Sequence, residues 1–71
     1  MMKVNSSMLN EIDYDDATKT LTVEFSNGAR FVYDQVPRIV YDKITTASSI
    51  GSTFNGLVKS KGYRYRKLEE K

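Results

Sequence analysis

The chain has 71 residues, no cysteine, no histidine and a formal net charge of +2. A chain this short forms one domain with a small core, and its composition excludes disulfides, zinc–thiolate sites and serine–histidine catalysis. It has no secretory signal, and no apolar run approaches the roughly 20 residues of a membrane helix, so we expect a soluble cytoplasmic protein.

The first half of the chain carries the pattern of three antiparallel strands. Apolar side chains of one parity predict a first strand over about residues 7–14, and the DDATK segment at 15–19 predicts a turn. The LTVEF segment at 21–25 alternates apolar and polar residues, which is typical of a half-buried strand. The ARFVY segment at 29–33 predicts the third strand.

The turn between the second and third strands determines their register. A two-residue loop would place Phe31 on the face opposite to Val23. A three-residue loop, with Gly28 in the left-handed region, pairs Val23 with Phe31 and Glu24 with Arg30. Because the apolar residues of both strands must share the buried face, we predict the three-residue loop.

The second half of the chain predicts two helices and a closing strand. Pro37 suits the first turn of a helix, where its missing N–H costs nothing. Two apolar stripes at helical spacing follow, separated by a break at Ser48 or Ser49. The stripes are Val40, Ile44 and Ala47, then Ile50, Phe54, Leu57 and Val58. Gly62 is expected to end the second helix, and YRYRKL at 63–68 predicts a strand.

Together these elements predict a single α+β domain: a three-stranded antiparallel meander, two short helices and a short C-terminal strand. The domain is expected over residues 4–68, with terminal tails at 1–3 and 69–71. The predicted core consists of Leu21, Val23, Phe31, Tyr33, Val40, Ile44, Phe54, Leu57 and Val58.

Several short motifs follow one another along most of the chain. They are Ser6-Ser7, the aromatic pair Phe31 and Tyr33, Val36-Pro37, the group Ala47, Ser49 and Gly51, Phe54-Asn55, and the pair Tyr63 and Tyr65. In this order and spacing they resemble the KTSC domain, found at the C-terminus of some lysyl-tRNA synthetases and in stand-alone bacterial and phage proteins. The resemblance implies the fold, and RNA binding has been suggested for that family. Phe31 stands where the family usually has tyrosine, and Asp13 where it often has glycine.

Catalytic chemistry is not predicted. A serine nucleophile needs a base, and without histidine the remaining option is a lysine of lowered pKa, whereas Lys43, Lys59 and Lys61 lie among polar neighbours. Asp15 and Asp16 are of the type that binds hard metal ions, but two acids in a turn are more often solvated. We expect no catalytic residue, metal or cofactor.

The expected start of the second helix is a candidate anion site. Its residues are Ser49, Gly51 and Asn55. Free N–H groups and the helix dipole attract anions at such a position. A helix cap with close packing explains the same residue types and is the commoner reason for them.

The segment KSKGYRYRK, residues 59–67, is the strongest candidate for binding. Its five cations, which we call the basic strip, are Lys59, Lys61, Arg64, Arg66 and Lys67, and Arg38 on the first helix is expected to extend it. Nucleic acids require cations for phosphates and aromatic rings for bases. Strand alternation places Tyr63 and Tyr65 on the face opposite to Arg64 and Arg66, so we expect both tyrosines in the core. The cations stay exposed either as a phosphate-binding surface or as a solvated basic face.

Two functions remain open, beside a remnant domain with only a structural role. The first is a non-catalytic domain that binds nucleic acid, RNA in preference to DNA, through the basic strip. The alternative is a phage or accessory module that docks on a host protein complex such as RNA polymerase, with no membrane involved. In that case the acidic residues Asp13, Asp15, Asp16 and Asp34 would matter as much as the strip. The charge split between residues 1–35 (−3) and residues 36–71 (+5) is consistent with either.

Overall fold

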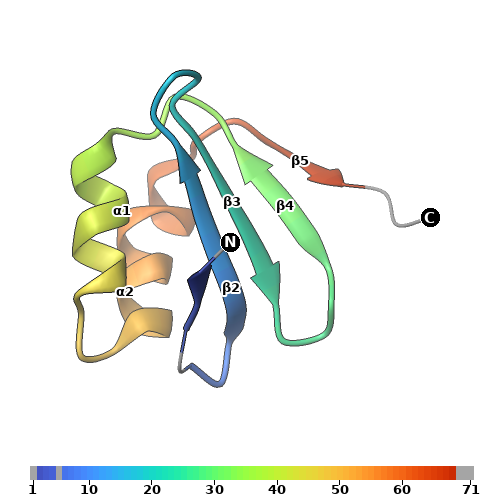
Figure 1. The fold of residues 1–71 in the computed structure, drawn as a ribbon, viewed down its shortest axis with the longest axis vertical. Coiled ribbons are helices and arrows are strands. Elements are labelled where there is room, and N and C mark those ends of the chain that lie inside the picture. Colours follow the sequence, from blue (N-terminus) through green and yellow to red (C-terminus); the bar gives the residue numbers. More distant parts are fainter. Residues whose placement is uncertain (1, 5, 69–71) are drawn as a thin grey trace.

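The computed structural model describes residues 2–4 and 6–68, which form one antiparallel sheet and two helices (Figure 1). The strands are β1 (Met2–Lys3), β2 (Leu9–Asp15), β3 (Thr20–Phe25), β4 (Arg30–Tyr33) and β5 (Tyr65–Leu68). The helices are α1 (Arg38–Thr45) and α2 (Ile50–Leu57), and a 3₁₀ turn, η1 (Lys59–Lys61), follows α2. The strands lie in the sheet in chain order from β1 to β5.

The α+β class and the two helices are confirmed, but the strand count is corrected. The C-terminal strand β5 pairs with β4 and so joins the meander as its fourth long strand. Residues 2 and 3, which the sequence assigns to a tail, form β1 and pair with β2. A strand of only two residues, such as β1, is too short to show a periodic pattern in the sequence. The pairing of β5 with β4 could not be predicted either, because it depends on the path of the chain through both helices. Residues 69–71 lie outside the described part of the chain.

The predicted register between β3 and β4 is confirmed. Val23 pairs with Phe31, and Glu24 pairs with Arg30. Gly28 has a φ of +91°, so the loop uses the left-handed conformation that glycine adopts most readily. Arg30 Nε donates to Glu24 Oε1 at 3.0 Å, and hydrogen bonds from Asn10 and Arg30 lower the pKa of Glu24.

Two glycine-to-alanine substitutions should have opposite effects on stability. At Gly28 a side chain would be strained by the positive φ, so Gly28→Ala is expected to destabilise by about 1 kcal/mol. Gly56 is exposed in α2 and a Cβ there meets open space, so Gly56→Ala should stabilise by about 0.5–1 kcal/mol. Urea denaturation of both variants measures the two signs. Equal changes in stability for the two variants would contradict the turn at Gly28 and the helix at Gly56.

Strand β2 contains a bulge that changes which side chains it buries. Leu9 pairs with Phe25, and the next pairing skips Asn10. Both Leu9 and Ile12 are therefore fully buried, although they differ in parity. Asn10 Nδ2 donates to the Phe25 carbonyl at 3.2 Å across the bulge. A strict two-residue alternation could not predict Leu9 as a core residue.

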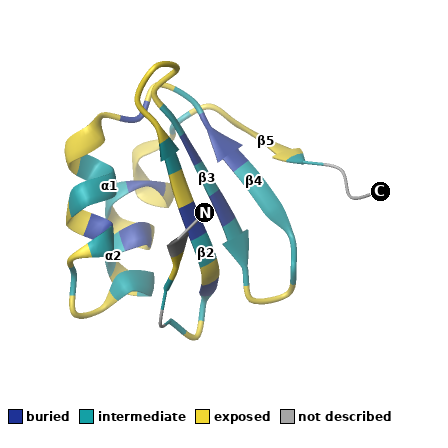
Figure 2. Ribbon diagram, viewed as in Figure 1, coloured by how far each residue is buried: buried dark blue, intermediate teal, exposed yellow. Residues whose placement is uncertain are grey.

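The core lies between the helices and the face of the sheet that they cover (Figure 2). Its buried residues are Leu9, Ile12, Leu21, Val23, Tyr33, Val36, Ile44, Phe54 and Val58. Six of the nine predicted core residues are buried, whereas Phe31, Val40 and Leu57 are only partly buried. None of the described helices has the length and apolar character needed to cross a bilayer.

Both helices begin within one residue of the predicted signals. Pro37 immediately precedes α1, and Ser49 immediately precedes α2. The second helix ends at Leu57 rather than at Gly62. Gly62 instead follows η1, with a φ of 78°, and turns the chain toward β5.

Candidate nucleic-acid interface

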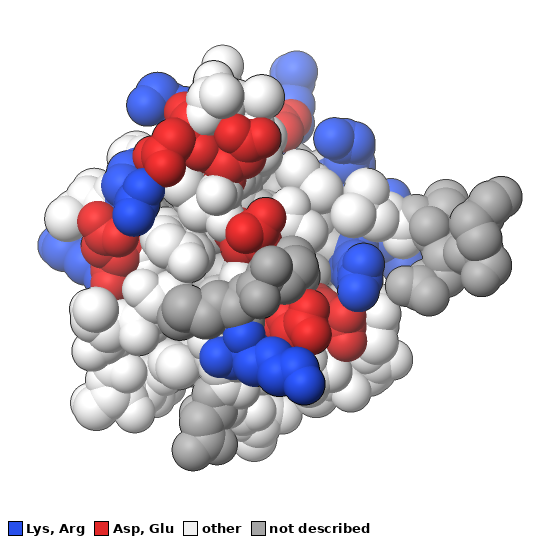
Figure 3. All heavy atoms as spheres, viewed as in Figure 1, with Lys and Arg blue, Asp and Glu red and all other residues white. Residues whose placement is uncertain are grey.

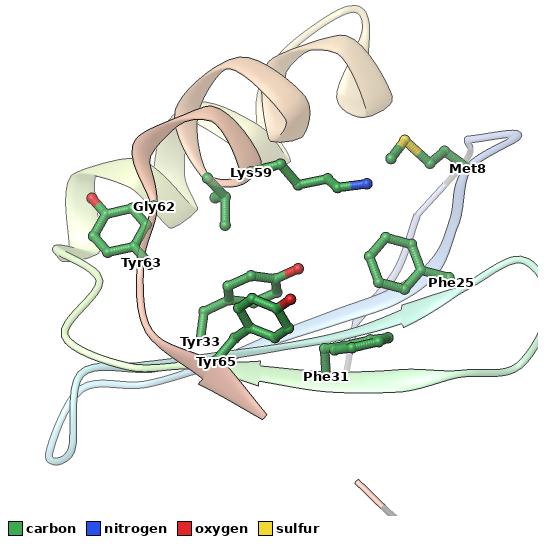
Figure 4. Close-up of a pocket in the computed structure, with 9 residues that line it drawn as sticks. Met8, Phe25, Phe31, Tyr33, Lys59, Gly62, Tyr63 and Tyr65 are labelled. Carbon is green, nitrogen blue, oxygen red and sulfur yellow. The ribbon is translucent and has the colours of Figure 1, made fainter. Parts of the chain in front are cut away.

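An open aromatic groove lies between strands β4 and β5 and the segment running from the end of α2 through η1 (Figure 4). Its volume is about 440 Å³. The lining residues are Met8, Phe25, Phe31, Tyr33, Val58, Lys59, Gly62, Tyr63 and Tyr65. None of these described lining residues is acidic.

The floor of the groove is a set of aromatic rings carried by β4 and β5. Tyr33 and Tyr65 are directly paired across the two strands, so their side chains share a face, and their ring centroids lie 5.5 Å apart. The Phe31 ring lies 5.8 Å from Tyr65 and meets Phe25 edge-on at 5.5 Å. Burial, with a smaller contribution from Tyr65, raises the pKa of Tyr33.

The prediction that both tyrosines of the closing strand are core residues is wrong for Tyr65. Tyr63 is partly buried and packs against the core, whereas Tyr65 is 59% exposed. Strand alternation assigned the correct face to Tyr65. That face is not closed over, because β5 extends beyond the helices at the far edge of the sheet (Figure 1).

One lysine of the basic strip lines the groove, and a second lies on the same face of the sheet. Lys59 Nζ lies 5.9 Å from the centroid of the Phe25 ring, and Figure 4 shows its side chain reaching from η1 across the groove toward Met8. Lys67 pairs with Phe31 and therefore projects on the same face as the aromatic floor. The groove thus offers aromatic surface together with positive charge.

The other three cations of the basic strip lie outside the lining of the groove. Arg66 pairs with Val32, so it projects from the opposite face of the sheet. Arg64 precedes β5, where its carbonyl accepts the Asp34 N–H at 2.8 Å, and Lys61 lies in η1. All three are exposed. Because β5 is an edge strand, cations from both faces lie along the same edge of the domain.

Arg38 lies with acidic residues rather than with the basic strip. Its guanidinium bonds Asp16 at 2.6 Å and Asp42 at 3.1 Å. Its carbon Cζ lies 5.9 Å from the centroid of the Tyr14 ring and 5.6 Å from that of Tyr41. The hydrogen bond to Asp42, followed by the charge of Asp16, raises the pKa of Arg38. Arg38 therefore ties the turn between β2 and β3 to α1.

Acidic side chains gather at that turn, at the upper end of the face drawn in Figure 3. Asp15 Oδ1 accepts the Ala17 N–H at 2.9 Å, so one of these acids also shapes the turn. Within residues 2–4 and 6–68, no group of three or more Asp, Glu, His or Cys side chains could hold a metal ion.

The candidate anion site forms part of a second, polar pocket of about 380 Å³ at the start of α2. Its lining includes Ser6, Ser7, Ser48, Ser49, Gly51, Ser52 and Asn55. The Ser6 hydroxyl accepts the Met8 N–H at 3.1 Å, which shapes the loop before β2. A Cβ at Gly51 would lie 3.3 Å from Met8 Cβ, so glycine allows that loop to approach α2. Close packing accounts for these motifs, and anion binding here stays a prediction.

Sequence reasoning found the cations but missed the groove. The contribution of Phe25 and Met8 depends on contacts between distant segments. The face on which Lys67 lies could have been predicted, since Lys67 shares parity with Tyr63 and Tyr65 in the closing strand.

Comparison with known proteins places this geometry in a family. Residues 5–67 match the KTSC domain. A protein from Stutzerimonas stutzeri is 38% identical, with 93% of each chain covered. The lysine–tRNA ligase of Nostoc punctiforme is 32% identical over 96% of this chain but only 12% of the ligase. The crystal structure of a KTSC domain protein from Yersinia pestis superimposes with a TM-score of 0.90 at 28% identity, covering 96% of this chain and 94% of that one.

Proposed function

Because the chain belongs to the KTSC domain family, we propose that it is a small, non-catalytic cytoplasmic domain that binds nucleic acid, with RNA preferred over DNA. The observation that carries the proposal is an aromatic groove lined by Lys59, with Lys67 on the same face of the sheet, both lysines belonging to a larger basic strip.

The basic strip supplies the electrostatic part of the interaction. All five of its cations are exposed along the segment that runs from η1 into β5. Lysine and arginine side chains bind phosphates by releasing condensed counterions, and this contribution does not depend on base sequence. Aromatic rings beside such cations supply the surface on which bases stack. We leave Arg38 out of this surface, because two carboxylates bind its guanidinium.

The preference for RNA draws support from the relatives. Three of them are lysine–tRNA ligases, which act on tRNA by name. A domain shared with such enzymes is well placed to contact RNA. The ligases are much longer than this chain, so their catalytic activity is not part of the proposal.

Affinity purification from a bacterial lysate tests the proposal. The tagged protein is captured at low salt, and parallel samples are treated with RNase, with DNase or with neither. We expect nucleic acid in the eluate that RNase removes and DNase leaves. The proposal would be contradicted by an eluate that contains no nucleic acid and instead contains proteins that stay bound after treatment with either nuclease. That result would favour docking on a larger protein machine such as RNA polymerase.

A further inference from the structure

We propose that the aromatic groove holds an unpaired base of a single-stranded RNA, stacked on Tyr65, while Lys59 and Lys67 contact the neighbouring phosphates. This inference rests on the proposed function and names the part of the nucleic acid that the site recognises.

The exposure of Tyr65 is the first step in this argument. Among the described residues, the large apolar side chains that stay exposed are Ile39 at 56% and Tyr65 at 59%. Ile39 lies on α1 outside the groove lining, whereas Tyr65 adjoins the rings of Tyr33 and Phe31 at 5.5 and 5.8 Å. Tyr33 is only 5% exposed and lies beneath this surface, whereas Phe31 is partly exposed, so a planar apolar ligand placed on Tyr65 would also reach the Phe31 ring.

The charge of the residues around the groove restricts the kind of planar ligand that the groove can bind. The ammonium of Lys59 lies 5.9 Å from the Phe25 ring centroid at one end of the groove. Lys67 projects beside Phe31 on the floor side. Since the described lining residues include no acid, the groove is complementary to a ligand that joins an aromatic group to negative charge. A nucleotide within a strand has that composition, with a phosphate on each side of every base.

The accessibility of the aromatic rings restricts the ligand to an unpaired RNA strand. The rings form the floor of a groove walled by the end of α2 and η1 (Figure 4). A base inside an RNA duplex is stacked on both faces, so it cannot also lie on Tyr65, whereas bases of loops and single strands can be splayed onto aromatic side chains. The volume of about 440 Å³ falls in the lower part of the range typical of small-ligand sites, about 300–1,000 Å³.

An abasic oligomer separates base stacking from phosphate binding. Fluorescence anisotropy at low salt compares a labelled eight-nucleotide oligoadenylate with an abasic ribose-phosphate chain of equal length and charge. We expect wild-type protein to bind the oligoadenylate about tenfold more tightly or better, which is the usual size of base–aromatic stacking. Tyr65→Ala should abolish that difference and leave the affinity for the abasic chain unchanged, whereas Tyr65→Phe should retain the difference.

The matched control is Ile39→Ala, which removes a side chain of similar exposure outside the groove and should leave the base preference intact. If Tyr65→Ala keeps the base preference, the inference is overturned while the proposed function stands. If wild-type protein binds neither oligomer, the proposed function itself is wrong.

Discussion

Phe54→Ala is expected to lower the free energy of unfolding by about 3–5 kcal/mol, enough to unfold much of a domain of this size. Phe54 is fully buried on α2. Its ring meets Phe25 and Tyr33 edge-on, each with 5.7 Å between centroids, so it joins the helices to the strands that carry the groove. Truncation leaves a cavity that short neighbouring elements cannot fill completely.

Urea denaturation followed by far-ultraviolet circular dichroism measures this loss. Ile39→Ala is the control, because a side chain 56% exposed on α1 should change stability by no more than about 0.5 kcal/mol. A wild-type denaturation curve for Phe54→Ala would show that α2 does not pack on the sheet as described.

Arg64→Glu combined with Arg66→Glu is expected to abolish the binding of single-stranded RNA at low salt. The double variant replaces two of the five strip cations with anions, so the charge of the strip falls from +5 to +1 and most of its attraction for phosphates is lost. Both arginines are exposed, and their replacement should leave the circular dichroism spectrum unchanged. Electrophoretic mobility shift measures the loss.

The control for this variant is Lys3→Glu combined with Lys43→Glu. Both lysines are exposed and lie outside the basic strip, on β1 and α1, and the change in net charge is the same. We expect RNA binding to weaken only slightly in the control. Equal losses in the two double variants would mean that net charge, rather than the strip, governs binding.

Local patterns were sufficient to predict most of the fold. The three-residue loop with Gly28 followed from the need to bury Val23 and Phe31 together, and the observed register agrees. The stripes that contain Ile44 and Phe54 lie on helices and face the core. In each case the deciding residues are close together in the chain.

Features that depend on distant contacts could not be predicted in the same way. The bulge at Asn10 buries Leu9 against the parity of its strand. Tyr65 faces the side that the helices cover, yet its exposure depends on where those helices end. Arg38 bonds Asp16, which lies 22 positions earlier in the chain, and this removes it from the predicted basic surface.

The salt dependence of RNA binding tests most directly the claim that the basic strip binds phosphates. For wild-type protein and single-stranded RNA, engagement of all five cations predicts a slope of log K against log salt of about −3.5, or about a hundredfold loss between about 50 and 200 mM. The Arg64→Glu and Arg66→Glu double variant should show no measurable binding across that range. A wild-type protein that does not bind RNA at about 50 mM salt, or binds it with a slope near zero, would contradict the account.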